Sequence, residues 1–332
     1  MKALLTLSIL LITTLIYSQY NYGLEVEAHD AKIEGKLNLD DGNRNVFIGE
    51  YAGINNSTGS ANVFIGKLTG VSNTTGYSNS FFGYGSGNLN TTGKANSFFG
   101  VRSGQYNNTG FFNSFFGAES GPNNTTGTQN SFFGSNSGNS NTTGDSNSFF
   151  GHLSGYNNTI GRSNSFFGFN AGYSNITGSS NSFVGKFSGN SNTTGAFNSF
   201  FGYNSGYHNK SGGNNVAIGY GAGPGSSSLN QSNKLYIDIN FTGGRDNPLI
   251  YGEFDNNLVK INGTFEVTGT LSVASAANLA SLHISETAKL EPQTAAPSTC
   301  TTAAEYGLMY YDSSSTTHKL KICTNAGWED LN

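Results

Sequence analysis

The chain has little charge. Asp, Glu, Lys and Arg make up 11% of its 332 residues, whereas an ordinary soluble domain has about 25%. The formal net charge is −4, and the 16 Lys and Arg residues are scattered, so no basic surface for nucleic acid or for an anionic membrane is predicted. Disorder is not predicted either, because disordered chains usually combine few apolar residues with a high net charge.

Proline and long apolar runs are also scarce. Five prolines and no Gly-X-Y period exclude a collagen triple helix. An apolar run from Ala3 to Tyr17 follows Met1 and Lys2, which predicts a secretory signal peptide over residues 1–18. An uncleaved membrane anchor is the alternative, although the run is shorter than the about 20 residues of a stable span. We therefore expect a secreted or cell-surface protein with no integral membrane segment after cleavage.

Glycine and asparagine, by contrast, are abundant, with 46 and 45 residues beside 25 Phe and 17 Tyr. The reason is a repeat of 17 residues that reads N-S-F-F-G-x-x-S-G-x-x-N-T-T-G-x-x, as in residues 130–146. We number its positions 1 to 17 from the first Asn. Ten full copies cover residues 45–214, and a shortened copy covers residues 215–225. The copies begin at Asn45, Asn62, Asn79, Asn96, Asn113, Asn130, Asn147, Asn164, Asn181, Asn198 and Asn215.

Each copy fits one coil of a β-solenoid. The apolar segment before the Gly of position 5 forms a strand too short for a sheet of its own, and the later Gly and Asn-Thr-Thr residues supply turns. Three glycines in 17 residues exclude a helix, at about 1 kcal/mol each relative to Ala. A register without insertions means that each copy stacks on its neighbours. We predict an all-β fold, a parallel β-solenoid (β-roll) of about eleven coils over residues 45–225, spaced about 4.8 Å apart.

Positions 3 and 4 form two apolar ladders on opposite faces of the stacked strands, because successive side chains of a strand alternate. A thin coil has one narrow interior, so one ladder fills it and the other faces outward as a ribbon larger than the apolar patches of soluble monomers. We therefore expect association of the chain with itself; a flattened monomeric coil that buries both ladders is the alternative. The predicted core or trimer-packing residues at position 3 are Phe47, Phe64, Phe81, Phe98, Phe115, Phe132, Phe149, Phe166, Phe183 and Phe200. Position 4 holds Ile48, Ile65, Phe82, Phe99, Phe116, Phe133, Phe150, Phe167, Val184, Phe201 and Ile218.

The first copy, N-V-F-I-G-E-Y-A-G at residues 45–53, and the eleventh, N-N-V-A-I-G-Y-G-A-G at residues 214–223, resemble the head repeats of YadA-like trimeric autotransporter adhesins. The resemblance implies a left-handed parallel β-roll in which three chains associate along an axis. The usual head unit is shorter, so the Asn-Thr-Thr segment is extra and is expected to bulge outward. The sequence after the repeat shows no set of amphipathic strands for the family's outer-membrane anchor. We therefore expect a bacterial secreted, fibre-like protein that carries such heads without that anchor.

Four segments flank the repeat. Residues 19–44 are predicted to be lead-in strands, and residues 226–257 a cap over the open end of the stack, which repeat proteins require. Residues 258–291 contain short alternating pieces separated by Gly or small residues, typical of an intertwined trimeric stalk. Residues 292–332 are predicted to form a small module.

The C-terminal module is predicted to contain a hairpin around residues 313–317, with Trp328 packed behind it. Cys300 and Cys323 are the only cysteines of the chain. In a secreted protein they are expected to form one disulfide that clamps a module too small to be secure on its own core. Two free thiols or an interchain bond are the alternatives.

Catalysis needs acids, bases or metal ligands that converge on one patch, and the repeat shows no such pattern. The nine charged residues between Asn45 and Gly225 form no row that runs through all copies, and His152 and His208 are isolated, which is typical of solvated turn residues. Neither the repeated Asp of a calcium-binding roll nor a phosphate-binding loop occurs. The protein is therefore predicted not to be an enzyme and to use no metal or cofactor.

Positions 6 to 11 vary between copies and carry aromatic residues on a polar background. Tyrosine offers rigid, amphipathic contact area, so these residues are candidates for binding a glycan or a host or matrix surface, although isolated surface tyrosines are ordinary. The candidates are Tyr51, Tyr84, Tyr106, Tyr156, Tyr173, Tyr203 and Tyr207, with Phe169 beside them.

The sequence N-x-[ST] occurs in most copies, for example at Asn73, Asn90, Asn141 and Asn192. We interpret it as a ladder of turn asparagines rather than as glycan acceptors. Together these patterns predict a non-enzymatic, homotrimeric fibre that mediates attachment at the bacterial cell surface. The alternatives are a receptor-binding protein of tail-fibre type, or a module that binds ice or polysaccharide through the stacked threonines of positions 13 and 14.

Overall fold

A computed structural model describes residues 42–239 and 247–268, and in the C-terminal part residues 292–293, 309–312, 319–324 and 327–330. The chain divides into two compact units, Met1–Phe265 and Glu266–Asn332. The predicted signal peptide, nearly all of the predicted lead-in, most of the predicted stalk and Cys300 lie outside the described residues, as does the side chain of Cys323.

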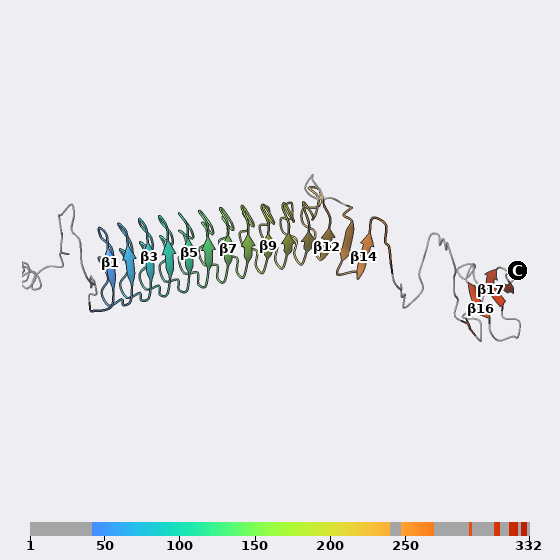
Figure 1. Cartoon of the computed structure of the whole chain (residues 1–332), viewed down its shortest axis with the longest axis horizontal. Coiled ribbons are helices and arrows are strands. Elements are labelled where there is room, and N and C mark those ends of the chain that lie inside the picture. The colour runs from blue at the N-terminus through green and yellow to red at the C-terminus, as the bar shows by residue number, and fades with distance from the viewer. Residues whose placement is uncertain are drawn as a thin grey trace, which may run out of the picture. The chain divides into compact units, whose positions relative to one another are not determined.

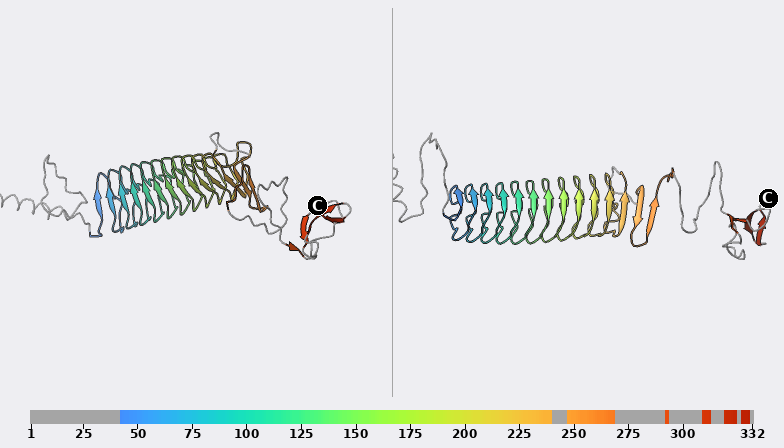
Figure 2. Two further views of the ribbon diagram at one scale, coloured as in Figure 1. Left: turned by 45° about the vertical axis from the view of Figure 1, so that its right-hand side comes forward. Right: turned by 60° about the horizontal axis from the view of Figure 1, so that its bottom comes forward.

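Each copy of the repeat contributes one three-residue strand, and the strands stack in chain order (Figures 1 and 2). Every adjacent pair is parallel and in register, so that each residue pairs with its equivalent in the next copy, as Phe132 does with Phe149. The prediction of an all-β, parallel β-solenoid is confirmed. The strands are β1 (Val46–Ile48), β2 (Val63–Ile65), β3 (Ser80–Phe82), β4 (Ser97–Phe99), β5 (Ser114–Phe116), β6 (Ser131–Phe133), β7 (Ser148–Phe150), β8 (Ser165–Phe167), β9 (Ser182–Val184), β10 (Ser199–Phe201) and β11 (Val216–Ile218).

The position-3 side chains fill the interior of the coils. From Phe64 to Phe200 every one of these rings is 0% exposed. Adjacent rings lie parallel, as in the Phe132 and Phe149 pair with centroids 4.8 Å apart and planes 5° apart. That spacing equals the separation of hydrogen-bonded strands, so one ring per coil forms a continuous column.

Residues with positive φ turn the backbone so that each coil closes around this column. The glycine of position 5 has φ between +118° and +140° in all copies, and the glycine of position 9 has φ between +53° and +64° in the ten full copies. A Cβ on Gly134, at position 5, would lie 2.5 Å from the carbonyl oxygen of Gly151 in the next coil. A Cβ on Gly121, at position 9, would lie 2.7 Å from the Phe115 ring of its own coil. Both glycines are therefore required by close backbone packing as well as by φ.

Two rows of asparagine, at positions 1 and 12, are also inside the coils, and all of their members except Asn56 are buried. The amide of Asn79, at position 1, donates to the carbonyl of Gly93 at 2.8 Å, and Asn90, at position 12, donates to the same carbonyl at 3.1 Å. Asn90 also donates to the side-chain oxygen of Asn73, one coil earlier, at 2.8 Å. Repeated in coil after coil, these bonds satisfy amides that would be costly to bury unpaired. The Asn-Thr-Thr segment thus does not bulge outward at its asparagine, because that residue belongs to the core.

The sheet continues beyond the repeat. Strand β12 (Lys234–Ile237) pairs in parallel with β11, and Tyr236 takes the place of the position-3 residue at 4% exposure. Strands β13 (Ile250–Glu253) and β14 (Leu258–Ile261) then pair antiparallel. The reversal of strand direction ends the solenoid. The sheet includes β14 and therefore extends beyond residue 257, the last residue of the predicted cap.

The second unit contains a small sheet of its own. Strand β16 (Met309–Asp312) pairs antiparallel with β17 (Lys319–Thr324), which pairs antiparallel with β18 (Gly327–Asp330). Strand β15 (Pro292–Gln293) pairs in parallel with β16. The predicted hairpin is present, and Trp328 lies in a third strand, opposite Cys323 in register.

Candidate binding surfaces

Two surfaces of the solenoid are candidates for binding, and the first is the position-4 ladder, which we call the Phe ribbon. Its side chains point away from the filled interior and are half-buried or exposed, with Ile48 at 46%, Phe167 at 40% and Phe201 at 43%. Between Phe82 and Phe167 the rings stack with centroids 4.5 to 4.9 Å apart. At 150–250 Å² for a whole aromatic side chain, the ribbon exposes on the order of 500 Å² of apolar surface. Such an area lies within the range of about 300–600 Å² of the largest apolar patches on monomers, so the ribbon is smaller than expected from the sequence because its side chains are partly buried.

The second surface is a group of aromatic residues around Lys186, which we call the Lys186 cluster. The Lys186 Nζ lies 5.2 Å from the ring centroid of Phe187, 5.4 Å from that of Phe169 and 5.9 Å from that of Tyr203. Tyr203 stacks on Tyr220 at 4.9 Å with planes 17° apart, and Phe187 meets Tyr207 edge to face at 6.4 Å. The cluster consists of Phe169, Lys186, Phe187, Tyr203, Tyr207 and Tyr220.

The seven candidate tyrosines therefore do not form a single surface. Tyr203 and Tyr207 join the Lys186 cluster through Phe187. Tyr156 and Tyr173, both at position 10, stack on each other at 5.2 Å with planes 6° apart. Their mutual faces are covered and cannot stack on a ligand.

The other three tyrosines lie on earlier coils. Tyr51 is 52% exposed and Tyr84 is 46% exposed. Tyr106 borders a shallow hollow of about 190 Å³ beside the ion pair of Arg102 and Glu119, whose closest atoms are 3.5 Å apart.

A single copy of the repeat does not indicate Lys186 or Phe187, because their aromatic neighbours belong to adjacent copies. The signal was present. Phe169, Lys186, Tyr203 and Tyr220 all occupy position 6 of successive copies, and in-register stacking places such residues side by side.

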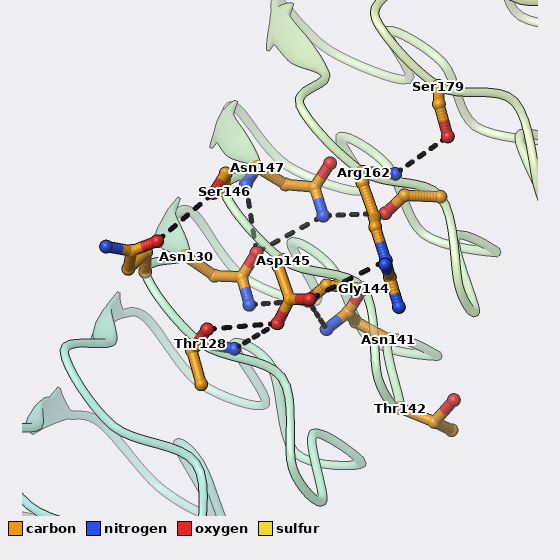
Figure 3. Close-up of polar contacts among 12 residues, drawn as sticks. Thr128, Asn130, Asn141, Thr142, Gly144, Asp145, Ser146, Asn147, Arg162 and Ser179 are labelled. Carbon is orange, nitrogen blue, oxygen red and sulfur yellow. Dashed lines mark hydrogen bonds and ion pairs between the residues drawn. The ribbon is translucent and has the colours of Figure 1, made fainter.

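Acidic residues of the described coils are paired with bases from the neighbouring coil. Glu50 lies 2.6 Å from Lys67, and the hydrogen bond and negative charge of Glu50 raise the pKa of Lys67. Asp145 accepts hydrogen bonds from the backbone N and the hydroxyl of Thr128 at 2.8 and 3.0 Å, and lies 3.6 Å from Arg162 (Figure 3). These exposed pairs contribute little stability, about 0–1 kcal/mol each, but they neutralise the charges involved.

The N-x-[ST] asparagines of position 12 are inaccessible in the folded coils. Asn141 is 0% exposed, and its Nδ2, the atom a glycan would occupy, donates to Asn124 Oδ1 at 2.7 Å and to the Gly144 carbonyl at 3.1 Å. Asn73, Asn90 and Asn192 are equally buried.

The two threonine rows differ. At position 13, Thr142 donates its hydroxyl to the carbonyl of Thr159 in the next coil at 3.1 Å. Most position-14 threonines are exposed, among them Thr75, Thr92 and Thr126. Only the second row offers its side chains to a ligand.

The two predicted isolated histidines lie next to aromatic rings. His152 is exposed and stacks on Phe169 at 5.5 Å, and His208 lies edge to face with Tyr207 at 5.1 Å. Among the residues that the structure describes, no group of three or more His, Cys, Asp or Glu residues is placed to hold a metal ion. Within the same residues, no helix is long and apolar enough to cross a membrane.

The fold and the repeat define this chain as a β-solenoid repeat protein. Comparison with family models, with curated proteins and with solved structures gives no match.

Proposed function

We propose that this protein is a secreted, non-enzymatic, homotrimeric fibre that mediates attachment at the bacterial cell surface, with a head of YadA-like type. The observation that carries the proposal is the Phe ribbon. It is continuous over the stacked strands, it lies on the face opposite the filled interior, and its rings are only partly buried. An apolar ribbon of this kind is stabilised by contact with equivalent ribbons of other copies.

The ribbon also has a size suited to self-association. Covering roughly 60 Å² of each ring contributes about 1.5 kcal/mol per ring. Replacing two rings in each of three chains would therefore cost a trimer about 9 kcal/mol. This is enough to shift the association equilibrium by several orders of magnitude.

Light scattering on the purified secreted protein tests the association state. The double substitution Phe116→Ser and Phe133→Ser, both at position 4, is expected to convert trimers to monomers. The matched control, Phe112→Ser and Phe197→Ser, removes two rings that are 55% and 64% exposed at position 17, where other copies carry Ser146 and Ser163. It is expected to remain trimeric. A folded wild-type monomer at micromolar concentration would disprove the trimer.

Attachment itself is tested by coating beads with the wild-type protein and measuring their retention on surfaces of bacterial or host origin under flow. Equal retention of wild-type beads and of beads coated with an unrelated protein would contradict a role in adhesion.

The exposed threonines of position 14 support a second candidate, a module that binds an ordered surface such as ice. Replacing Thr75, Thr92 and Thr126 with Val keeps the shape of the row and removes its hydroxyls. If the protein shapes growing ice crystals and this variant does not, the second candidate is favoured over the first.

A further inference from the structure

The Lys186 cluster combines an unpaired cation with aromatic rings at a place where the chain has no acidic residue. Between Asp145 and Asp238 the sequence contains no Asp or Glu. Lys186 is exposed, and among the described residues no carboxylate lies within ion-pair distance of it. Its counterpart at position 6 of an earlier coil, Lys67, is bound to Glu50 at 2.6 Å.

The rings hold the ammonium group in place without neutralising it. Cation–π contacts at exposed sites contribute about 0.5–1 kcal/mol each, and Lys186 lies within 6 Å of three rings. An ammonium group has three donors. These donors are available to an anionic ligand, because aromatic rings bind an ammonium group more weakly than a paired carboxylate does.

The orientation of the rings indicates what kind of ligand fits. Tyr203 and Tyr220 come from successive coils and lie nearly parallel, so the normals to their planes follow the axis of the solenoid. The faces that the two rings turn toward each other are therefore covered, and the pair presents ring edges to the solvent at the side of the solenoid. Ring edges carry the positive part of the aromatic quadrupole, and they reinforce the charge of Lys186 instead of offering a flat platform.

Successive members of this row are separated by the coil spacing, which is 4.9 Å between the Tyr203 and Tyr220 rings. This spacing is close to the length of one pyranose residue in an extended polysaccharide. A polysaccharide lying along the row would place successive sugars beside successive coils, with a negative group beside Lys186. A nucleic acid is a poor fit, because its affinity depends on many cations contacting the phosphate backbone.

We propose that the Lys186 cluster binds the anionic sugars of an acidic polysaccharide. The proposal rests on the attachment function proposed above and names its partner class. The anionic group is a carboxylate or a sulfate ester, and both share the chemistry that Lys186 recognises. The cluster uses positions 6, 7 and 10, so it does not require the Phe ribbon at position 4.

The test is affinity electrophoresis of the purified secreted protein through gels that contain polygalacturonate, dextran sulfate or neutral dextran. We expect retardation by at least one anionic polymer, weakened by 0.5 M salt because exposed charges are screened, and none by neutral dextran. Lys186→Ser, which installs the residue found at position 6 as Ser135, is expected to weaken binding at least tenfold. The control Lys67→Ser is expected to bind as the wild type does. Retardation by polygalacturonate alone identifies uronates, and retardation by dextran sulfate alone identifies sulfate esters.

A second variant tests the rings. Phe187→Asn introduces the residue type that other copies have at position 7. Asn136, Asn170 and Asn204 all adopt left-handed φ there, so the coil is expected to fold. It is expected to weaken binding by several-fold while Lys186 is kept.

Equal retardation of wild type and Lys186→Ser, or retardation by neutral dextran as strong as by the charged polymers, would overturn the proposal. Binding to vesicles rich in phosphatidylserine with no binding to any polysaccharide would also overturn it, in favour of a membrane partner. Light scattering on the same samples separates the two proposals. A monomer that binds acidic polysaccharide disproves the trimer alone, and a trimer that binds none disproves the polysaccharide site alone.

Discussion

Gly85 and Gly87 lie two residues apart in one coil and provide a test of how the ring column fixes the turns. Both have left-handed φ, +64° and +55°, so replacing either with Ala imposes a similar backbone strain of about 1 kcal/mol. A Cβ on Gly85 would have Arg102 Cγ as its nearest neighbour, at 3.8 Å, which is an ordinary contact. A Cβ on Gly87 would overlap the ring of Phe81.

The Phe81 ring cannot move away from a new Cβ. It is 0% exposed, and its centroid lies 4.8 Å from the rings of Phe64 and Phe98 on either side. Overpacking a filled core costs about 1–3 kcal/mol, in addition to the backbone strain. We therefore expect Gly85→Ala to lower the free energy of unfolding by about 1 kcal/mol and Gly87→Ala to lower it by about 2–4 kcal/mol.

Urea unfolding followed by circular dichroism measures the two variants against the wild type. Because repeat arrays can open locally, hydrogen exchange should be measured as well, and faster exchange is expected in the second to fourth coils of Gly87→Ala only. If the two variants differ by less than about 0.5 kcal/mol and exchange alike, the reasoning that the Phe column dictates glycine at position 9 is refuted.

Two further predictions concern the buried amides and the Glu253 carboxyl of β13. Asn141→Ala removes three hydrogen bonds: the two that Asn141 Nδ2 donates, and the one that Asn141 Oδ1 accepts from the Asn158 amide at 2.9 Å. We expect a loss of about 2–4 kcal/mol in urea unfolding, against less than about 1 kcal/mol for the half-buried neighbour Asn139→Ala, and equal losses would contradict the buried ladder. At the end of β13, hydrogen bonds from Asn256 and then Tyr251 lower the pKa of Glu253. The ionised Glu253 carboxylate therefore stabilises the folded state above pH 4.5, the ordinary pKa of a glutamate. This contribution is lost as the pH falls from there through the lowered pKa of the folded state. Thermal unfolding from about pH 6 to 3 should show this loss in the wild type and less of it in Glu253→Gln, and an unchanged acid dependence in that variant would exclude the mechanism.

The interval of 17 residues could be read from the sequence, and the fold class followed from it because every copy has the same strand and turn residues. The existence of two apolar ladders also followed, since a strand presents alternate residues to opposite faces. The sequence did not show that asparagines of positions 1 and 12 are core residues. A single Asn resembles a turn residue, and only stacking places the side-chain oxygens of Asn62 and Asn73 as acceptors for the amides of Asn79 and Asn90 in the next coil.

The candidate surface was predicted only in part. Tyr203 and Tyr207 were singled out as aromatics on a variable edge, but nothing in one copy shows that Phe187 of another copy joins them. Lys186 was counted among scattered charges. Its significance depends on contacts with residues 17 positions before and after it, Phe169 and Tyr203.

The number of coils, their register and the pairing of equivalent residues follow from the amino-acid sequence, because an uninterrupted period leaves no other way to stack. Which ladder fills the interior depends on the folded chain. Alternation makes the faces of Phe132 and Phe133 equivalent in a lone strand, and the choice depends on the direction in which the chain turns next. Residues with left-handed φ at positions 5, 7 and 9 turn the chain over the position-3 side chain. At position 7 most of these residues are not glycine, as Leu153 and Phe187 show. The backbone N–H of Phe187 donates to the Phe169 carbonyl of the preceding coil at 2.9 Å, a contact that no single copy contains.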